Sequence, residues 1–225
     1  MSKTISILCA TCALILTFSC SKDDPKKDSK KDPTGGVEAV DLGLPSGTKW
    51  ASWNVGAKSE TDCGSYFAWG ETSVKTNYTW NTYKWGKQTE SAPDYGMTKY
   101  KSKGPSTLEA VDDPATAAWG SKWRSPSLDE IKELLDNCDW TWTAKNGVNG
   151  YTVTSKTNSN NIFLPATGYR LGAEFLNAGE IGHYWSSSPH ESHPYFAYIF
   201  SFKTSYHVST VDYRCYGLPV RAVTE

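Results

Sequence analysis

Aromatic side chains are the feature that most limits how this chain can fold. The 225 residues include 10 Trp, 13 Tyr and 7 Phe, or 13% of the chain. Disordered chains have few such residues, so the rings must build a core or a binding surface. They are interrupted by 18 Gly and 11 Pro, which end helices and strands after short runs. The pattern predicts a domain rich in loops and strands and excludes a helix bundle.

Charge and length narrow the class of protein further. The formal net charge is −1, whereas a general nucleic-acid binder needs a strongly basic face. We therefore expect no nucleic-acid partner. A length of 225 residues suits one domain. The hydrophobic fraction of 38% is enough for one globular core and too low for a protein that crosses a membrane many times.

The first 20 residues have the character of an export signal. Lys3 gives a positive start, and the apolar stretch 5–18 is too short to span a bilayer but fits the core of a signal peptide. The stretch ends in Thr-Phe-Ser-Cys, which resembles the lipobox of bacterial lipoproteins. This resemblance implies a signal peptide over residues 1–19 and lipidation of Cys20. An ordinary secretory signal followed by an incidental cysteine stays open as the alternative.

Residues 21–36 predict a solvated tether after Cys20. They hold five Lys, four Asp and two Pro and end in Gly-Gly, so they have nothing with which to pack a core. The acidic pair Asp23-Asp24 resembles the surface-export signal of Bacteroidota lipoproteins, with plain linker charge as the alternative. We expect a protein of the bacterial outer membrane that faces outward and is held by its lipid alone. One domain should then occupy residues 37–225.

Cysteine usage gives only a weak constraint on the folded part. Three cysteines remain there, namely Cys63, Cys138 and Cys215. An odd number permits one disulfide outside the cytoplasm, but the sequence cannot assign it. No Cys-x-x-Cys or Cys/His spacing indicates structural zinc.

Two helices are predicted from their boundaries. Asp112 or Asp113 caps a short helix that starts with a proline in its first turn and stops at Gly120. Ser127 and Glu130 form a capping-box pattern before a second helix. In that helix the leucines and the isoleucine fall on one face, and the charged residues fall on the other.

Short runs with strand character surround these helices. They cover residues 48–53, 151–155, 161–164, 182–188, 195–203 and 218–223, and residues 66–71 form a further apolar run. In 195–203, alternation turns every second side chain from Phe196 to Phe202 toward the core and leaves Ile199 and Ser201 facing solvent. Strands with two interposed helices predict an α+β fold with small mixed or antiparallel sheets. Residues 72–106 have the composition of a long irregular excursion that the pattern does not place.

Seven pieces of the sequence follow one another across residues 37–225: VDLGLPSGTKWASWNVGA, YFAWGE, WGSKWRSPSLDEIKELLDNCDWTW, NGVNGYTVTSKTN, IFLPATGYR, YWSSS and GLPVRAV. Together they resemble the Fibrobacter succinogenes major paralogous domain family, which is similar to the C-type lectin fold. The resemblance implies that residues 48–53 and 218–223 pair as terminal strands. It also implies that two helices pack on small sheets and that long loops on one face recognise a ligand. Glu71 and Arg124 lie in these pieces and are expected to form a buried polar pair that fixes loops.

The sequence offers little for metal binding or catalysis. His190 and His193 have a chelating spacing, but variable surface histidines explain it better. The calcium motifs of sugar-binding C-type lectins are absent. Ser187, His183 and Asp212 lack the strained turn of a nucleophile elbow. Formylglycine-generating enzymes share a related fold but use a pair of C-terminal cysteines, and this chain has one there. We expect no cofactor, no metal and no catalysis, with an enzyme on that scaffold as the alternative.

Composition changes near the C-terminus. There are ten Asn and twelve Lys between Gly35 and Gly182, but no Asn and one Lys from Ala178 onward. Residues 189–216 contain no Gln, Met or Trp, one Lys and one Glu, and these five types cannot arise when the adenines of an Asn codon are replaced. The bias resembles the variable region of proteins diversified by a retroelement, which also use a C-type lectin scaffold. Residues 189–218 are therefore a candidate variable region, with a surface loop of biased composition as the alternative.

These observations predict a non-catalytic ligand-binding module whose partner is an unknown protein or glycan at the cell surface. A structural surface or pilus-associated subunit is a further alternative. Tyr and His combine an apolar body with a polar tip, which suits broad recognition. The expected binding residues are His190, Ser192, His193, Tyr195, Ile199, Ser201, Tyr206, His207, Ser209, Asp212, Tyr213, Cys215 and Tyr216. Val208 and Arg214 between them are expected to be scaffold. Trp80, Tyr83 and Trp85 are either a second, sugar-binding platform or loop packing.

Overall fold

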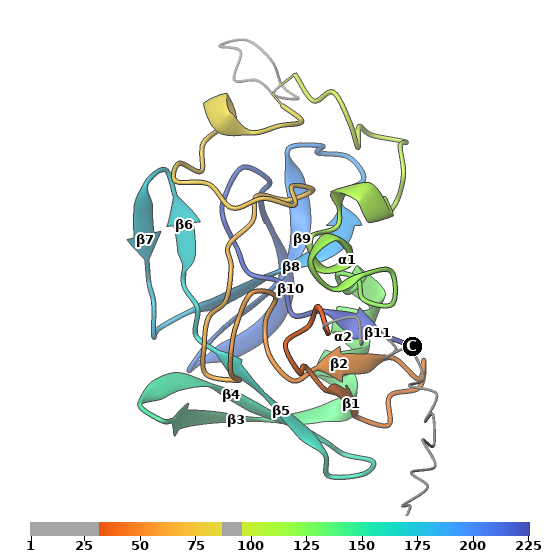
Figure 1. Cartoon of the computed structure of the whole chain (residues 1–225), viewed down its shortest axis with the longest axis vertical. Coiled ribbons are helices and arrows are strands. Elements are labelled where there is room, and N and C mark those ends of the chain that lie inside the picture. The colour runs from red at the N-terminus through yellow and green to blue at the C-terminus, as the bar shows by residue number, and fades with distance from the viewer. Residues whose placement is uncertain (1–31, 87–95) are drawn as a thin grey trace, which may run out of the picture. The chain divides into compact units, whose positions relative to one another are not determined.

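Four small antiparallel sheets and two short helices make up the described part of this computed structural model, residues 32–86 and 96–225 (Figure 1). The sequence prediction of an α+β fold with small sheets is confirmed. Cys20, Asp23 and Asp24 lie outside the described residues. Within the described ranges, no helix is long and apolar enough to cross a membrane.

The first sheet joins the two ends of the folded chain. It has the order β1-β2-β11 and consists of Ala39–Asp41, Lys49–Ala51 and Val223–Thr224. Trp50 at its centre lies opposite Val40 on one side and Val223 on the other. All three side chains pack into one hydrophobic cluster, which explains why the terminal strands pair although they are far apart in sequence.

The sheet that carries most of the candidate site has the order β10-β9-β8. Its strands are Gly182–Pro189 (β8), Phe196–Lys203 (β9) and Tyr206–Tyr213 (β10). The long hairpin of β9 and β10 keeps an unbroken register from Tyr206 opposite Lys203 to Tyr213 opposite Phe196. Pairing of β8 with β9 is interrupted between Trp185 and Pro189. The sequence predicted β8 and β9 but not β10.

Both faces of this sheet are buried near its middle. Phe200 and Phe202 pack into one hydrophobic cluster, whereas Ile199 packs with Trp185 into a second cluster on the other face. The expectation that Ile199 and Ser201 face solvent is therefore wrong, because they are 1% and 3% exposed. Alternation of rings with smaller side chains is typical of a sheet with one wet face, but a sheet between two cores hides both sets.

Two further sheets complete the strand content. One has the order β3-β4-β5, with strands Cys138–Lys145, Val148–Ser155 and Asn161–Pro165, and the other pairs β6 (Tyr169–Leu171) with β7 (Glu174–Leu176). The predicted hairpin of residues 151–155 and 161–164 is confirmed as the facing parts of β4 and β5. The sequence did not predict β3, β6 or β7.

Both predicted helices are present with the predicted caps. Helix α1 is Pro114–Trp119; Asp113 caps its start by accepting from two backbone N–H groups, and Gly120 caps its end. Helix α2 is Leu128–Asn137 and begins with the Ser127/Glu130 capping box. Two single 3-10 turns precede them, Trp80–Thr82 (η1) and Ala110–Asp112 (η2). Cys63, Cys138 and Cys215 are free thiols, so none of the three joins a disulfide.

Candidate recognition surface

The loop between β8 and β9 is held in shape by one imidazole. Nδ1 of His190 accepts hydrogen bonds from the backbone N–H groups of Ser192 and His193, each at 3.2 Å. The backbone closes the same turn, since His190 N–H donates to the Phe196 carbonyl and Phe196 N–H donates to the His193 carbonyl. A loop with satisfied backbone groups presents its side chains in one arrangement. Ser192 and His193 are exposed at its tip.

From this loop a continuous series of ring contacts crosses the ends of β9, β10 and β6, and we call it the aromatic ladder. Neighbouring ring centroids are 4.6 to 6.1 Å apart, within the range of favourable aromatic pairs. Its members in order of contact are His183, Tyr169, Tyr216, Tyr213, Phe196, Tyr195, His193, His190 and Tyr198, with Trp80 joining at Tyr213. His193 is exposed and every other member is half-buried. Every member therefore keeps some surface that solvent or a ligand can reach.

A buried arginine, Arg214, is hydrogen-bonded to the backbone of one ladder residue, Phe196. Arg214 is completely buried; its Nε donates to the Phe196 carbonyl at 2.9 Å and its Nη1 donates to the Tyr100 carbonyl at 3.0 Å. Its guanidinium lies 4.3 Å from the centre of the Trp69 ring. Burial lowers the pKa of Arg214 to about 10, and it still carries its charge at neutral pH. The bond to the Phe196 carbonyl holds the start of β9 in place.

An acid–histidine pair lies at one end of the ladder. Nδ1 of His183 is 3.4 Å from Oδ2 of Asp212, and the His183 ring stacks on Tyr169. The Ser187 hydroxyl is bonded instead to Thr107, at 2.9 Å. Of the three residues that would form a Ser/His/Asp set, the described contacts thus bring only His183 and Asp212 together.

The remaining predicted residues lie at the other end of the β9–β10 hairpin or inside the fold. His207 stacks on Trp140 of β3 with centroids 4.9 Å apart, and burial lowers its pKa. Tyr206 lies beneath the Lys203 ammonium. Ser209 lies opposite Phe200 in the middle of the sheet. His207 thus helps to join two sheets, and this end of the hairpin is separate from the ladder.

Cys215 is a correction, since it is buried rather than on the binding face. It is 1% exposed and packs with Tyr66 and Tyr78 in a third hydrophobic cluster. Burial raises the pKa of its thiol to about 12. Val208, expected to be scaffold, is 42% exposed, because it lies on the edge strand β10.

The ladder includes rings that sequence reasoning assigned elsewhere. Phe196 and Tyr198 were expected in the core but are half-buried, because the sheet extends beyond the core at this end. Tyr169 reaches the ladder from β6, and nothing in its local sequence marks it. Trp80 comes from the irregular excursion, where a sugar platform was one of two alternatives. Tyr83 of that platform is only 4% exposed and donates to the Trp69 carbonyl, so for Tyr83 loop packing is correct.

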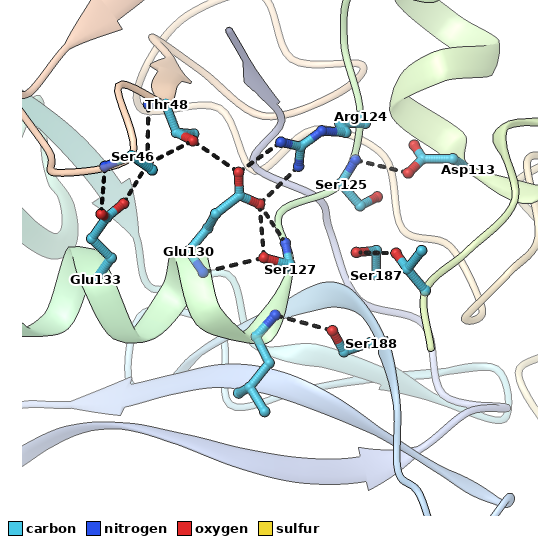
Figure 2. A network of polar contacts seen from close by, with 12 residues as sticks. Ser46, Thr48, Asp113, Arg124, Ser125, Ser127, Glu130, Glu133, Ser187 and Ser188 are labelled. Atoms are coloured by element: carbon cyan, nitrogen blue, oxygen red, sulfur yellow. Dashed lines mark hydrogen bonds and ion pairs between the residues drawn. The ribbon is translucent and has the colours of Figure 1, made fainter. Parts of the chain in front are cut away.

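A separate polar network joins α2 to the turn before β2 (Figure 2). Arg124 makes two hydrogen bonds to the Glu130 carboxylate, both at 2.7 Å, and the Thr48 hydroxyl and the Ser127 N–H also donate to it. Burial by itself would raise the pKa of Glu130, but these donors outweigh it and hold the pKa at about 2. An open cavity of about 510 Å³ lies beside the network. Every oxygen of the carboxylate is engaged, which fits a structural role.

The expected pairing of Glu71 with Arg124 is wrong. Glu71 pairs with Lys75 at 2.8 Å, four residues along the chain, and also accepts from the Lys84 N–H. Arg124 instead takes Glu130 from the helix that follows it. Glu71 and Arg124 are thus each paired with a residue close in sequence. The carboxylates of Glu71 and Glu130 both hold loops through hydrogen bonds to backbone N–H groups.

Potential metal ligands do not gather in the described residues. The rings of His190 and His193 are 4.9 Å apart, but one nitrogen of His190 is occupied by the loop backbone. No group of three or more His, Cys, Asp or Glu side chains in the described ranges could hold a metal ion.

Comparison with known proteins adds no family to this geometry. No family model matches the chain, no curated protein matches it, and no solved structure matches it. The function of this chain is therefore inferred from its own residues.

Proposed function

We propose that this chain is a surface lipoprotein whose folded domain is a non-catalytic binding module, with the aromatic ladder as its recognition face. The observation that carries the proposal is the unbroken series of half-buried rings along residues 190–216 and their neighbours. Large rings gain much contact area and lose few rotamers when they bind. Because the ladder rings already contact one another, a ligand that binds them has to immobilise few side chains.

The polar atoms on the ladder suit a ligand of mixed character. Tyr198 donates its hydroxyl to Glu191 at 3.0 Å, and the imidazole of His193 lies exposed beside Tyr195. A surface of rings edged by hydroxyl and imidazole groups contacts apolar patches and satisfies hydrogen bonds together. This chemistry supports a protein or a glycan as the ligand and supplies no nucleophile activated by a base.

The sequence features extend the proposal to cell location and family. The lipobox-like end of residues 1–19, Cys20 and the charged tether support a lipid-anchored protein of the outer membrane that faces outward. Resemblance to the Fibrobacter succinogenes major paralogous domain family supports a C-type-lectin-like domain, and pairing of β2 with β11 fits that proposal. The biased composition of residues 189–218 supports targeted diversification, since most of the ladder comes from this segment.

A binding screen with matched variants tests the recognition face. The chain from residue 32 is exposed to a glycan array and to a panel of extracellular proteins, together with the double variant His193→Ala/Tyr195→Ala. The control is Val111→Ala/Lys122→Ala, which changes two exposed residues outside the ladder. We expect signals of the parent chain to survive in the control and fall at least tenfold in the ladder variant. Equal signals in all three proteins, or none in the parent, would contradict the proposal.

A further inference from the structure

Arg170 differs from the other arginines in the described residues because its guanidinium donates no hydrogen bond there. Arg124 is paired with Glu130, while Arg214 and Arg221 are bonded to backbone carbonyls. Among residues 32–86 and 96–225, no carboxylate lies within ion-pair distance of Arg170, and no hydrogen bond is formed by its guanidinium. A guanidinium carries five N–H donors, so Arg170 is half-buried with its donors available.

Two aromatic rings hold this guanidinium in place. Arg170 lies on β6 directly opposite Phe175 on β7, at the outer hairpin of Figure 1. Its guanidinium carbon is 5.0 Å from the centre of the Phe175 ring and 5.3 Å from that of Tyr66. Tyr66 is itself fixed, because its hydroxyl donates to the Thr167 carbonyl at 2.6 Å. Cation–π contacts of this kind orient an arginine without using its N–H groups.

Arg170 also lines an open cavity of about 520 Å³. Ser65 and Thr76 contribute hydroxyls to the wall, and Val74 and Ala173 contribute apolar surface. Lys75 is a second cation there, but Glu71 already compensates its charge at 2.8 Å. Among the described residues, the cavity therefore contains one positive charge without a carboxylate partner, two hydroxyls and short apolar patches.

We propose that this cavity binds a sugar acid, with its carboxylate on Arg170. An arginine holds a carboxylate by two parallel hydrogen bonds, which a lysine cannot do. The hydroxyls of Ser65 and Thr76 match sugar hydroxyl groups, and Val74 and Ala173 match the apolar face of a pyranose ring. The site is distinct from the aromatic ladder, because Tyr169 and Arg170 are consecutive strand residues and point to opposite faces. It does not depend on the proposed function of the ladder.

Calorimetric titration of the chain with D-glucuronate, D-glucose and acetate tests the site. We expect glucuronate to bind, to weaken as salt is added, and to exceed both glucose and acetate in affinity by at least tenfold. Arg170→Ala should lose at least tenfold in affinity for glucuronate, and Arg170→Lys should lose part of it. Lys122→Ala removes one exposed positive charge elsewhere and should change nothing.

A second variant keeps the test independent of folding. Thr76→Val removes one hydroxyl, leaves Arg170 in place and should weaken glucuronate severalfold; a thermal melt of each variant confirms that it folds. Three results would overturn the proposal: no binding of glucuronate to the parent, equal binding of glucose, or unchanged binding by folded Arg170→Ala. Equal affinity for acetate would show that the cavity binds a carboxylate but does not recognise the sugar, and it would overturn the proposal of a sugar acid as the ligand. The ladder variant His193→Ala/Tyr195→Ala should bind glucuronate normally, which separates this test from that of the ladder.

Discussion

At the residue scale, Ser127 shows how one hydroxyl sets the start of a helix. Its Oγ accepts from the Glu130 N–H at 3.2 Å and donates to the Glu130 carboxylate at 2.9 Å. We expect Ser127→Ala to lower the free energy of unfolding by about 1 kcal/mol, the ordinary value of a helix cap. The denaturant midpoint at constant slope measures the effect. Ser102→Ala, an exposed serine in a loop, is the control and should leave the midpoint unchanged.

The Glu130 carboxyl makes stability depend on pH in a defined direction. Its pKa of about 2 lies below the ordinary 4.5, so the unfolded chain takes up a proton at a higher pH than the folded chain. The stabilisation is complete above about pH 5 and is lost as the pH falls toward 2. Between about pH 6 and about pH 3 this carboxyl should remove roughly 2 kcal/mol from the free energy of unfolding.

Urea unfolding of the parent and of Glu130→Gln at these two pH values measures that loss. The variant should lose less stability on acidification than the parent, because it no longer titrates at this position. Asp129→Asn removes a neighbouring exposed charge and should keep the full loss of the parent. Identical pH dependence in the parent and in Glu130→Gln would show that Glu130 does not contribute to the loss of stability in acid.

At the element scale, β9 is buried from Ile199 to Phe202 but partly exposed at its start, Phe196. Phe196 and Phe202 share one face of the strand, yet Phe202 is 0% exposed and Phe196 is half-buried in the ladder. We expect Phe202→Ala to cost roughly 3–5 kcal/mol of stability and Phe196→Ala clearly less. Thermal melts of the two variants check this. Similar losses would mean that the ladder end is core, and the binding-face account would then be wrong.

The elements that sequence could predict are those with local signals. Helix α2 has a capping box and an apolar stripe, and α1 has an aspartate, a proline and a glycine in the right order. Strand β3 follows α2 without any Gly or Pro to mark the boundary at Cys138. Strand β10 mixes polar and apolar residues as edge strands do, so its pattern resembles a loop. β11 has two residues because the rest of 218–223 is held by isolated bridges and by buried arginine contacts.

At the scale of the whole molecule, the candidate site shows both the reach and the limit of the sequence. Composition alone pointed to residues 189–218, and five of the predicted binding residues lie in the ladder: His190, His193, Tyr195, Tyr213 and Tyr216. The sequence could not show that a second hydrophobic cluster on the other face of the sheet buries Ile199. Nor could it show that Tyr169 and Trp80 reach the ladder from distant segments. Those facts depend on tertiary packing.

The proposed attachment to the membrane also concerns the whole molecule. We expect Cys20→Ser to release the protein or leave it unprocessed, because the thiol that would carry the lipid is gone. Detergent partitioning of cell fractions measures this, and unchanged membrane association would count against lipidation.

Replacing Asp23 and Asp24 by Ala should leave the lipid in place but lower exposure on intact cells, as measured by protease shaving. Equal shaving of the parent and the variant would show that the acidic pair is not an export signal.

The most direct test of the recognition face compares two histidines of the same chain. The imidazole NMR signals of His193, at the exposed end of the ladder, and of His207, stacked on Trp140 at the other end of the hairpin, are followed while a ligand from the binding screen is added. The account predicts that the His193 signal shifts until the site is saturated and that the His207 signal stays in place. A bound ligand that shifts His207, or that leaves His193 unmoved, would contradict it.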